Sequence, residues 1–250
     1  NLDIMFDRVV LDENSYLENF NGNIEFNKNK ITSVNLISRF PNKDKFSFSI
    51  KSGNNNQKIT ALYSDNAEPF VKKFNFIKDF KDGKIDFFSI KKNNVSKSNI
   101  KIFKFKVRDV PALATLLSLA SLQGIADLMT GEGIRFEEFD MKFSNKNDLM
   151  TIDEIYAIGP AISILTSGYV EKNNLISLRG TLVPATTLNK FIGSIKFLGG
   201  ILVGKKTGDG VFGVSFKIKG PPKNLKTTVN PIKTLTPRFI VRILEKIKKN

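Results

Sequence analysis

Short runs in which apolar and polar residues alternate constrain the fold of this chain more than any other feature. Residues 46–50 place two Phe and an Ile on one side of an extended backbone and two Ser on the other. Residues 212–219 show a similar alternation. Dipeptides typical of turns, such as Asn21-Gly22, separate these runs. The pattern predicts a mainly β protein of the α+β kind, with an antiparallel meander of strands. Comparable runs occur at 24–26, 31–37, 59–63, 85–90, 100–107, 134–143, 152–158, 162–170 and 175–183.

Two of the runs change the side on which their apolar residues fall. In residues 100–107 the change comes at Ile102 and Phe103, and in residues 134–143 it comes across Glu137 and Glu138. A change of this kind predicts a β-bulge, which bends a strand and increases its twist. We therefore expect a sheet that bends at both places.

Four segments have helical periodicity, at 69–80, 111–129, 187–198 and 237–249. The second begins with Pro111, which suits the first helical turn, and Asp109 is expected to cap it. Its uncharged stretch raises the alternative of a helix that spans a membrane. That stretch is at the lower limit of the required length and carries a stripe of Thr and Ser, so we expect a helix packed on a sheet.

The chain contains no His, Cys or Trp among its 250 residues. This excludes zinc sites built on imidazole or thiolate, Ser-His and Cys-His nucleophile pairs, and disulfides. Residues 199–207 approach a phosphate-binding loop, but Lys206 stands where the motif requires Ser or Thr. The carboxylates form no catalytic constellation. We therefore expect a protein that is not an enzyme, with no catalytic residues, cofactor or metal.

The formal net charge of +15 is unevenly distributed. Residues 217–250 contain ten Lys and Arg against one acid, which is a net charge of +9. The C-terminal end is therefore expected to meet an anionic surface. Nucleic acid is not the expected partner, because Lys outnumbers Arg by 32 to 7 and the tail has few aromatic residues on which bases stack.

The last predicted helix combines a cationic face with an apolar face, as a helix that lies on anionic lipid requires. A surface helix docked on the sheet is an equal alternative. The residues expected to contact a membrane or an envelope protein are Arg238, Phe239, Ile240, Arg242, Ile243, Lys246 and Ile247.

Phe is abundant, with 22 residues against four Tyr. Phe at alternating positions makes one face of a sheet strongly apolar, and that face either forms an ordinary core or stays open as a groove for acyl chains. The choice between the two requires the register of the sheet. The residues predicted to contact lipid are Phe46, Phe48, Phe103, Phe105, Phe212 and Phe216.

The C-terminal half carries a series of motifs in a fixed order. Residues 109–114 read DVPALA and are followed by LSLASLQG at 117–124 and GEGIRF at 131–136. GTLVPA at 180–185 and VNP at 229–231 continue the series. In this order the motifs resemble those of the AsmA-like C-terminal region, which belongs to the AsmA/TamB/YhdP superfamily of bacterial envelope proteins.

The resemblance implies a single AsmA-like domain over residues 1–250, as a fragment of a longer chain. Residues 1–107 would be mostly strands with a short helix at 69–80, and 108–250 would be the signature region. It implies a long curled antiparallel sheet that forms an open groove, with about four helices including a terminal amphipathic one.

The same resemblance implies a function in the cell envelope. Phospholipid would move along the groove between the inner and outer membranes without covalent chemistry, as part of outer membrane biogenesis. The protein would lie in the periplasm, anchored to the inner membrane by a segment N-terminal to this fragment. The alternative is a structural or assembly module of the envelope with a closed core and a protein partner.

Overall fold

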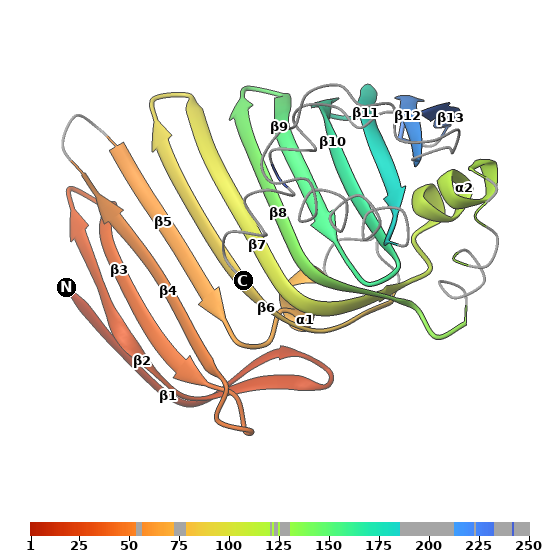
Figure 1. The fold of residues 1–250 in the computed structure, drawn as a ribbon. Helices are drawn as coiled ribbons and strands as arrows, with labels where there is room; N and C mark the ends of the chain where they lie inside the picture. Colours follow the sequence, from red (N-terminus) through yellow and green to blue (C-terminus); the bar gives the residue numbers. More distant parts are fainter. Residues whose placement is uncertain are drawn as a thin grey trace, which may run out of the picture.

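The described strands form a single antiparallel sheet of 13, in which every strand pairs with its neighbours along the chain (Figure 1). The computed structural model describes residues 1–53, 57–72, 79–120, 122, 125, 131–185, 213–222, 224–232 and 242. The expected mainly β meander is confirmed. The strands are β1 (Leu2–Asp12), β2 (Ser15–Asn27), β3 (Lys30–Arg39), β4 (Lys45–Ser52), β5 (Gln57–Ser64), β6 (Asp79–Lys92), β7 (Val95–Arg108), β8 (Ile134–Lys146), β9 (Leu149–Ile158), β10 (Ile162–Glu171), β11 (Leu175–Pro184), β12 (Gly213–Gly220) and β13 (Lys226–Ile232).

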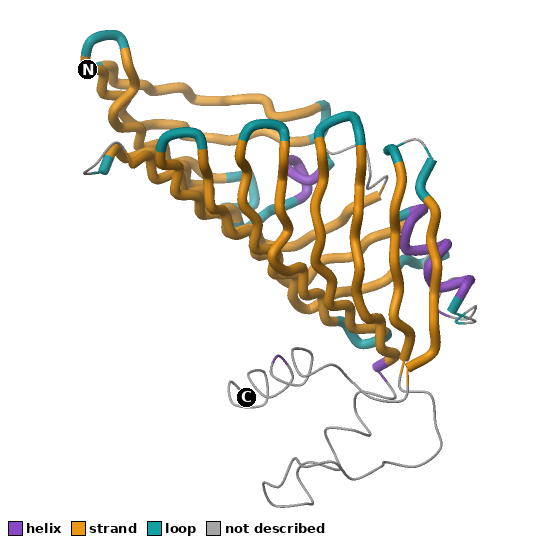
Figure 2. The backbone as a smooth tube through the Cα atoms, turned by 90° about the horizontal axis from the view of Figure 1, so that it is seen from above, coloured by secondary structure: helices purple, strands orange, loops and turns teal. Residues whose placement is uncertain are grey.

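The sheet is open and twisted, with β1 and β13 at its opposite ends (Figures 1 and 2). It is not strongly curled, so the expectation of a long curled sheet is wrong. A bulge bends a sheet because it sets two residues of one strand against one residue of the next. At the two predicted places the pairing shows no such shift. Phe103 pairs with Glu138 and Phe105 with Phe136, so each strand contributes the same number of residues.

The predicted change of side is nevertheless present, and it crosses three strands. Ile102 and Phe105 both lie in the main apolar cluster although they are three residues apart. Between them Lys104 has a φ of 53°, and beside it in β6 Gly83 has a φ of 88°. A Cβ at Gly83 would lie 2.9 Å from the Cβ of Phe105, so this close approach requires glycine. In β6 and β7 the reversal therefore comes from left-handed residues and not from inserted ones.

Two short helices are described, α1 (Glu68–Val71) and α2 (Pro111–Leu119). The prediction of a helix over 69–80 is wrong at the C-terminal end of that range. Asp79 and Phe80 begin β6 and pair with Arg108 and Val107 of β7. Helix α2 begins at Pro111 as predicted but stops before the expected 129. Its N-cap is Val110, which makes no side-chain cap, so the predicted capping by Asp109 is wrong. The remaining parts of the expected helices lie outside the described residues: most of 120–130, all of 187–198, and 237–249 except Arg242.

The turn that follows β5 is held by the carboxylate of Asp65. Lys84 Nζ and Tyr63 Oη donate to Asp65 Oδ1 at 2.8 and 2.7 Å, and the backbone N–H of Lys45 donates to Oδ2 at 3.0 Å. These hydrogen bonds, that from Lys84 first, lower the pKa of Asp65 to about 2. The hydrogen bond that Tyr63 donates to Asp65 raises the pKa of the Tyr63 hydroxyl. Three neighbouring strands are therefore joined through one ionised side chain.

The main apolar cluster lies on one face of the sheet, although Tyr156, Leu165 and Val183 are buried on the other face. Val71 of α1 and Leu117 of α2 are buried in the main cluster with Ile85, Ile102 and Phe216. Within this cluster the ring of Phe105 stacks between those of Phe80 and Phe136, at centroid distances of 5.2 and 5.4 Å. A smaller cluster around Leu17, Phe40 and Phe46 covers the same face towards β1. Both helices thus cover part of one sheet face, which positions the candidate site.

Candidate functional site: an open apolar face

One apolar row crosses the whole sheet at right angles to the strands. Residues that pair directly across strands point to the same side, so each pairing places the next member on the same face. We call this set of residues the central row, and the face that carries it the apolar face. Its members, from β1 to β13, are Ile4, Gly22, Leu36, Phe48, Leu62, Phe87, Ile100, Met141, Ile155, Thr166, Gly180, Phe216 and Val229.

The central row is accessible over most of its length. All its members from Ile4 in β1 to Ile155 in β9 are half-buried, whereas Phe216 in β12 is buried in the core. Eight strand spacings of about 4.8 Å make the accessible part about 38 Å long. One acyl chain occupies roughly 15 Å of a bilayer, half of its ~30 Å hydrocarbon core. The accessible row is therefore longer than one acyl chain.

The two rows beside the central row differ from each other in burial. On one side the paired residues Ile85 and Ile102 are buried in the core. On the other side the row is mixed: Ile24 and Ile50 are half-buried, and the hydroxyls of Ser89 and Ser98 are hydrogen-bonded at 2.9 Å. The central row therefore borders a covered core on one side and a partly polar row on the other.

The opposite face, which we call the polar face, carries a different set of side chains. The row that backs the central row pairs Asn35 with Ser49, Ser49 with Ala61, and Asn99 with Lys142. Isolated apolar residues are exposed among them, such as Ile37 and Phe88. Over β1 to β8 the sheet is therefore amphipathic, with an accessible apolar face and a mainly polar face.

The six residues predicted to contact lipid occupy different environments. Phe48 is a half-buried member of the central row. Phe46 is 8% exposed and stacks on Phe70 at 5.7 Å, and Phe105 and Phe216 are 6% exposed in the core. Phe103 is half-buried and pairs with Lys84 and Glu138, which places it on the polar face. Phe212 lies outside the described residues.

Sequence reasoning missed most of the accessible row. Leu36, Leu62, Ile100, Met141 and Ile155 were not singled out, because their runs contain apolar residues on both faces. In 85–90, for example, Phe87 lies on the apolar face and its neighbour Phe88 on the polar face. Only the pairing register distinguishes them, and no signal within the run does so.

Arg242 is the described member of the predicted membrane-contacting helix, and it is bound within the chain. Its Nε donates to Glu154 Oε1 at 2.7 Å, and its Nη2 lies 3.4 Å from Asp140 Oδ2. Both acids are buried on the polar face, and Asn99 also donates to Asp140 at 2.6 Å. The guanidinium carbon is 5.3 Å from the centre of the Tyr156 ring. The other six predicted residues, from Arg238 to Ile247, lie outside the described residues.

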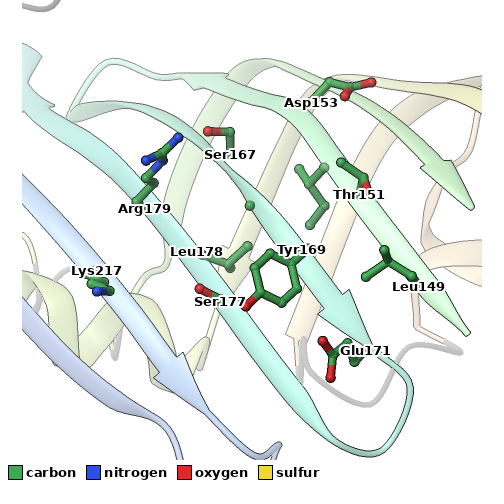
Figure 3. A pocket seen from close by; sticks show the side chains of 12 residues that line it. Leu149, Thr151, Asp153, Ser167, Tyr169, Glu171, Ser177, Leu178, Arg179 and Lys217 are labelled. Carbon is green, nitrogen blue, oxygen red and sulfur yellow. The ribbon is translucent and has the colours of Figure 1, made fainter.

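A hollow of about 770 Å³ lies over β9 to β12 (Figure 3). Hydroxyl groups of Thr151, Ser167, Tyr169 and Ser177 line it, together with the cations of Arg179 and Lys217 and the acids Asp153 and Glu171. Leu149, Ile152, Gly168 and Leu178 complete the lining. The hollow is chemically mixed and differs in this from the central row.

Two features of the described part of the chain bear on other functions. No group of three or more acids there is placed to hold a metal ion. No helix in the same residues has both the length and the apolar character needed to cross a bilayer. The comparisons with known proteins find no matching family model, no matching curated protein and no matching solved structure. The AsmA-like resemblance stays a prediction.

Proposed function

We propose that this protein binds phospholipid acyl chains along the central row and transfers lipid without covalent chemistry. The observation that carries the proposal is the run of half-buried positions from Ile4 to Ile155, which crosses nine strands and carries an apolar side chain on each of them except β2, where Gly22 stands. A soluble protein normally covers a face of this size, since burial of apolar area stabilises the fold. An acyl chain laid along the row would supply that cover.

The energetics favour movement along the row. Each CH₂ group removed from water contributes about 0.8 kcal/mol, so extraction of a whole chain into water is strongly unfavourable. A lipid that passes from one strand to the next keeps its chain in apolar contact throughout. In the environment that the resemblance implies, such a row would form an apolar groove for phospholipid between the inner and outer membranes. The protein would act in the periplasm, tethered to the inner membrane by an upstream segment.

Lipid binding is tested by incubation of delipidated protein with vesicles of phosphatidylethanolamine and phosphatidylglycerol, followed by native mass spectrometry. We expect adducts of phospholipid mass. Repeated spectra without lipid adducts would contradict the proposal.

The site is tested with a photo-reactive amino acid placed at Leu62 or, as a matched control, at the adjacent Ala61. Leu62 belongs to the central row, and Ala61 points to the polar face of the same strand. We expect lipid cross-links at Leu62 and few at Ala61. Equal yields at the two positions would mean that lipid does not prefer the apolar face of the sheet.

The first strand supports a second candidate function, that of an assembly module with a protein partner. Among the described strands, β1 pairs only with β2, which leaves its other edge free to pair. Met5, Val10 and Phe6 on this strand are 84%, 66% and 55% exposed. An apolar edge strand is a template on which another chain adds a strand. Replacement of Val10 by Pro should abolish an association of this kind, seen by analytical ultracentrifugation, and leave lipid uptake unchanged.

A further inference from the structure

The excess positive charge of this protein lies almost entirely in its last third. Residues 172–250 contain 16 Lys and Arg and only two acids, Asp209 and Glu245. Residues 1–171 contain 23 Lys and Arg and 22 acids, so they are close to neutral. Any site that owes its chemistry to excess cations is therefore expected near β11 to β13.

The sheet brings four of these cations together on the polar face. Arg179 of β11 pairs directly with Lys217 of β12, and Lys219 of β12 pairs directly with Lys226 of β13. The two pairs lie in adjacent rows of one face, because Lys217 and Lys219 are two residues apart on a strand. All four side chains are exposed. We call these four residues the basic patch.

Like charges in directly paired positions destabilise a sheet. The basic patch repeats this unfavourable arrangement twice. Among the described residues, no ion pair involves any of the four cations. An external anion that neutralises both pairs would remove the repulsion.

The hollow over β9 to β12 adjoins the basic patch and shares Arg179 and Lys217 with it (Figure 3). Ser167 pairs with Arg179, and Ser177 pairs with Lys219, so hydroxyl groups lie next to the cations on the same face. Of the two acids in the hollow, Glu171 accepts a hydrogen bond from Asn174 at 2.6 Å. Cations beside hydroxyl donors suit the oxygens of a phosphate-bearing headgroup.

We propose that the basic patch docks on the surface of an anionic lipid bilayer, with a phosphate-bearing headgroup accommodated at the adjoining hollow. A bilayer is favoured over nucleic acid for two reasons. The cations are mostly Lys, which suit a diffuse surface charge better than bidentate recognition. Only one ring, that of Tyr169 in the adjoining hollow, is available among the described lining residues for bases to stack on. The proposal concerns the polar face and does not depend on lipid binding along the central row.

The size of the expected effect follows from the number of cations. Each Lys or Arg close to an anionic bilayer strengthens binding about fivefold at low salt. Loss of all four should therefore weaken binding by at least tenfold, and by up to several hundredfold if the contributions are independent. Because screening weakens such contacts, binding by the unchanged protein should fall steeply as salt is added.

The test uses the full chain in sedimentation with two kinds of vesicle, phosphatidylcholine alone and phosphatidylcholine mixed with phosphatidylglycerol. The variant R179Q/K217Q/K219Q/K226Q removes the basic patch. The matched control K51Q/K91Q/K92Q/K97Q removes four exposed Lys from β4, β6 and β7. We expect the patch variant to lose binding to the anionic vesicles and the control to keep most of it. Equal losses in the two variants, or unchanged binding by the patch variant, would overturn the proposal.

Folding of the patch variant is checked by thermal unfolding, and its Tm should not fall, because the variant relieves repulsion between paired cations. A second measurement leaves every cation in place. Since the chain contains no Cys, a single dye can be attached at S177C beside the patch or at S49C far from it on the same face. Anionic vesicles should change the fluorescence only at position 177. A change at both positions, or at neither, would contradict the assignment.

A soluble polyanion distinguishes the bilayer from other sources of phosphate. Polyphosphate should compete with the vesicles for the patch. If the protein binds polyphosphate through the four cations but does not bind anionic vesicles, the bilayer proposal is wrong and the surface recognises a soluble polyanion.

Discussion

The two faces of the sheet are built from the same strands but have different chemistry. On the apolar face, the central row is accessible through β1 to β9, and beside it the core is covered by α1 and α2. On the polar face, charge is buried in an ion pair at Arg242 and Glu154, and it is exposed and unbalanced in the basic patch. The comparison shows that stability and binding are separated within each face. On each face the buried side chains stabilise the fold, and the accessible side chains remain available for a ligand.

The largest effect is expected in the core of the apolar face, with F105A. Phe105 is 6% exposed and stacks on two other rings, so its loss leaves a cavity and should lower the free energy of unfolding by about 3–5 kcal/mol. The matched change on the polar face, F88A, removes a side chain that is 44% exposed and should cost less than about 1 kcal/mol. Denaturation by urea measures both. Similar losses would remove the distinction between the faces.

The next largest effect is expected at the buried charges of the polar face. R242A leaves Glu154 and Asp140 buried without their guanidinium and should destabilise the protein by about 2–3 kcal/mol. The control K142Q changes an exposed Lys that pairs with Glu154 across the strands, and should cost less than about 0.5 kcal/mol. A stability of R242A equal to that of the unchanged protein would show that the cluster contributes nothing.

A smaller effect on stability, but a clear one on binding, is expected in the central row. L62N/F87N should reduce lipid uptake about tenfold, because it removes apolar contact worth roughly 1–2 kcal/mol to an acyl chain. A61N/F88N changes the adjacent residues, which point to the polar face, and should leave uptake within about twofold. Quantitative lipid analysis of the purified proteins measures the ratio. Uptake that falls equally in both variants would place the lipid elsewhere.

The smallest effect is expected from the ionised Asp65 and depends on pH. Because hydrogen bonds lower its pKa to about 2, its contribution is present above the unfolded pKa, near pH 4, and is lost as pH falls through about 2. D65N should therefore cost about 1 kcal/mol at neutral pH and little near pH 2. Thermal unfolding of both proteins across this range measures the difference. A constant difference across the range would mean that the carboxylate charge is not its source.

Much of the fold was predictable from local patterns. Alternation located most of the strands, and the changes of side near Ile102 and Glu137 were visible in the sequence because side chains alternate strictly along a strand. The end of the helix expected over 69–80 was not predictable. Phe80 fits a helical spacing, but its pairing with Val107 in β7 places it in a strand. Long-range pairing outweighed the local preference there.

The candidate site was much less predictable than the fold. Of the five described Phe that were expected to contact lipid, only Phe48 lies on the accessible part of the central row. Leu36 and Met141 belong to the same row although more than 100 residues separate them in the chain. The basic patch was hidden for the same reason. Arg179 joins Lys217 only because β11 pairs with β12.

The sequence by itself determined that this chain forms an antiparallel meander, has no imidazole or thiol chemistry and carries its excess charge towards the C-terminus. Those properties depend on residue types and on their order along short runs. The tertiary structure decided which side chains share a face, and therefore where the central row and the basic patch lie. The physical reason is that a slip of one residue in any strand pair would move every side chain of that strand to the other face.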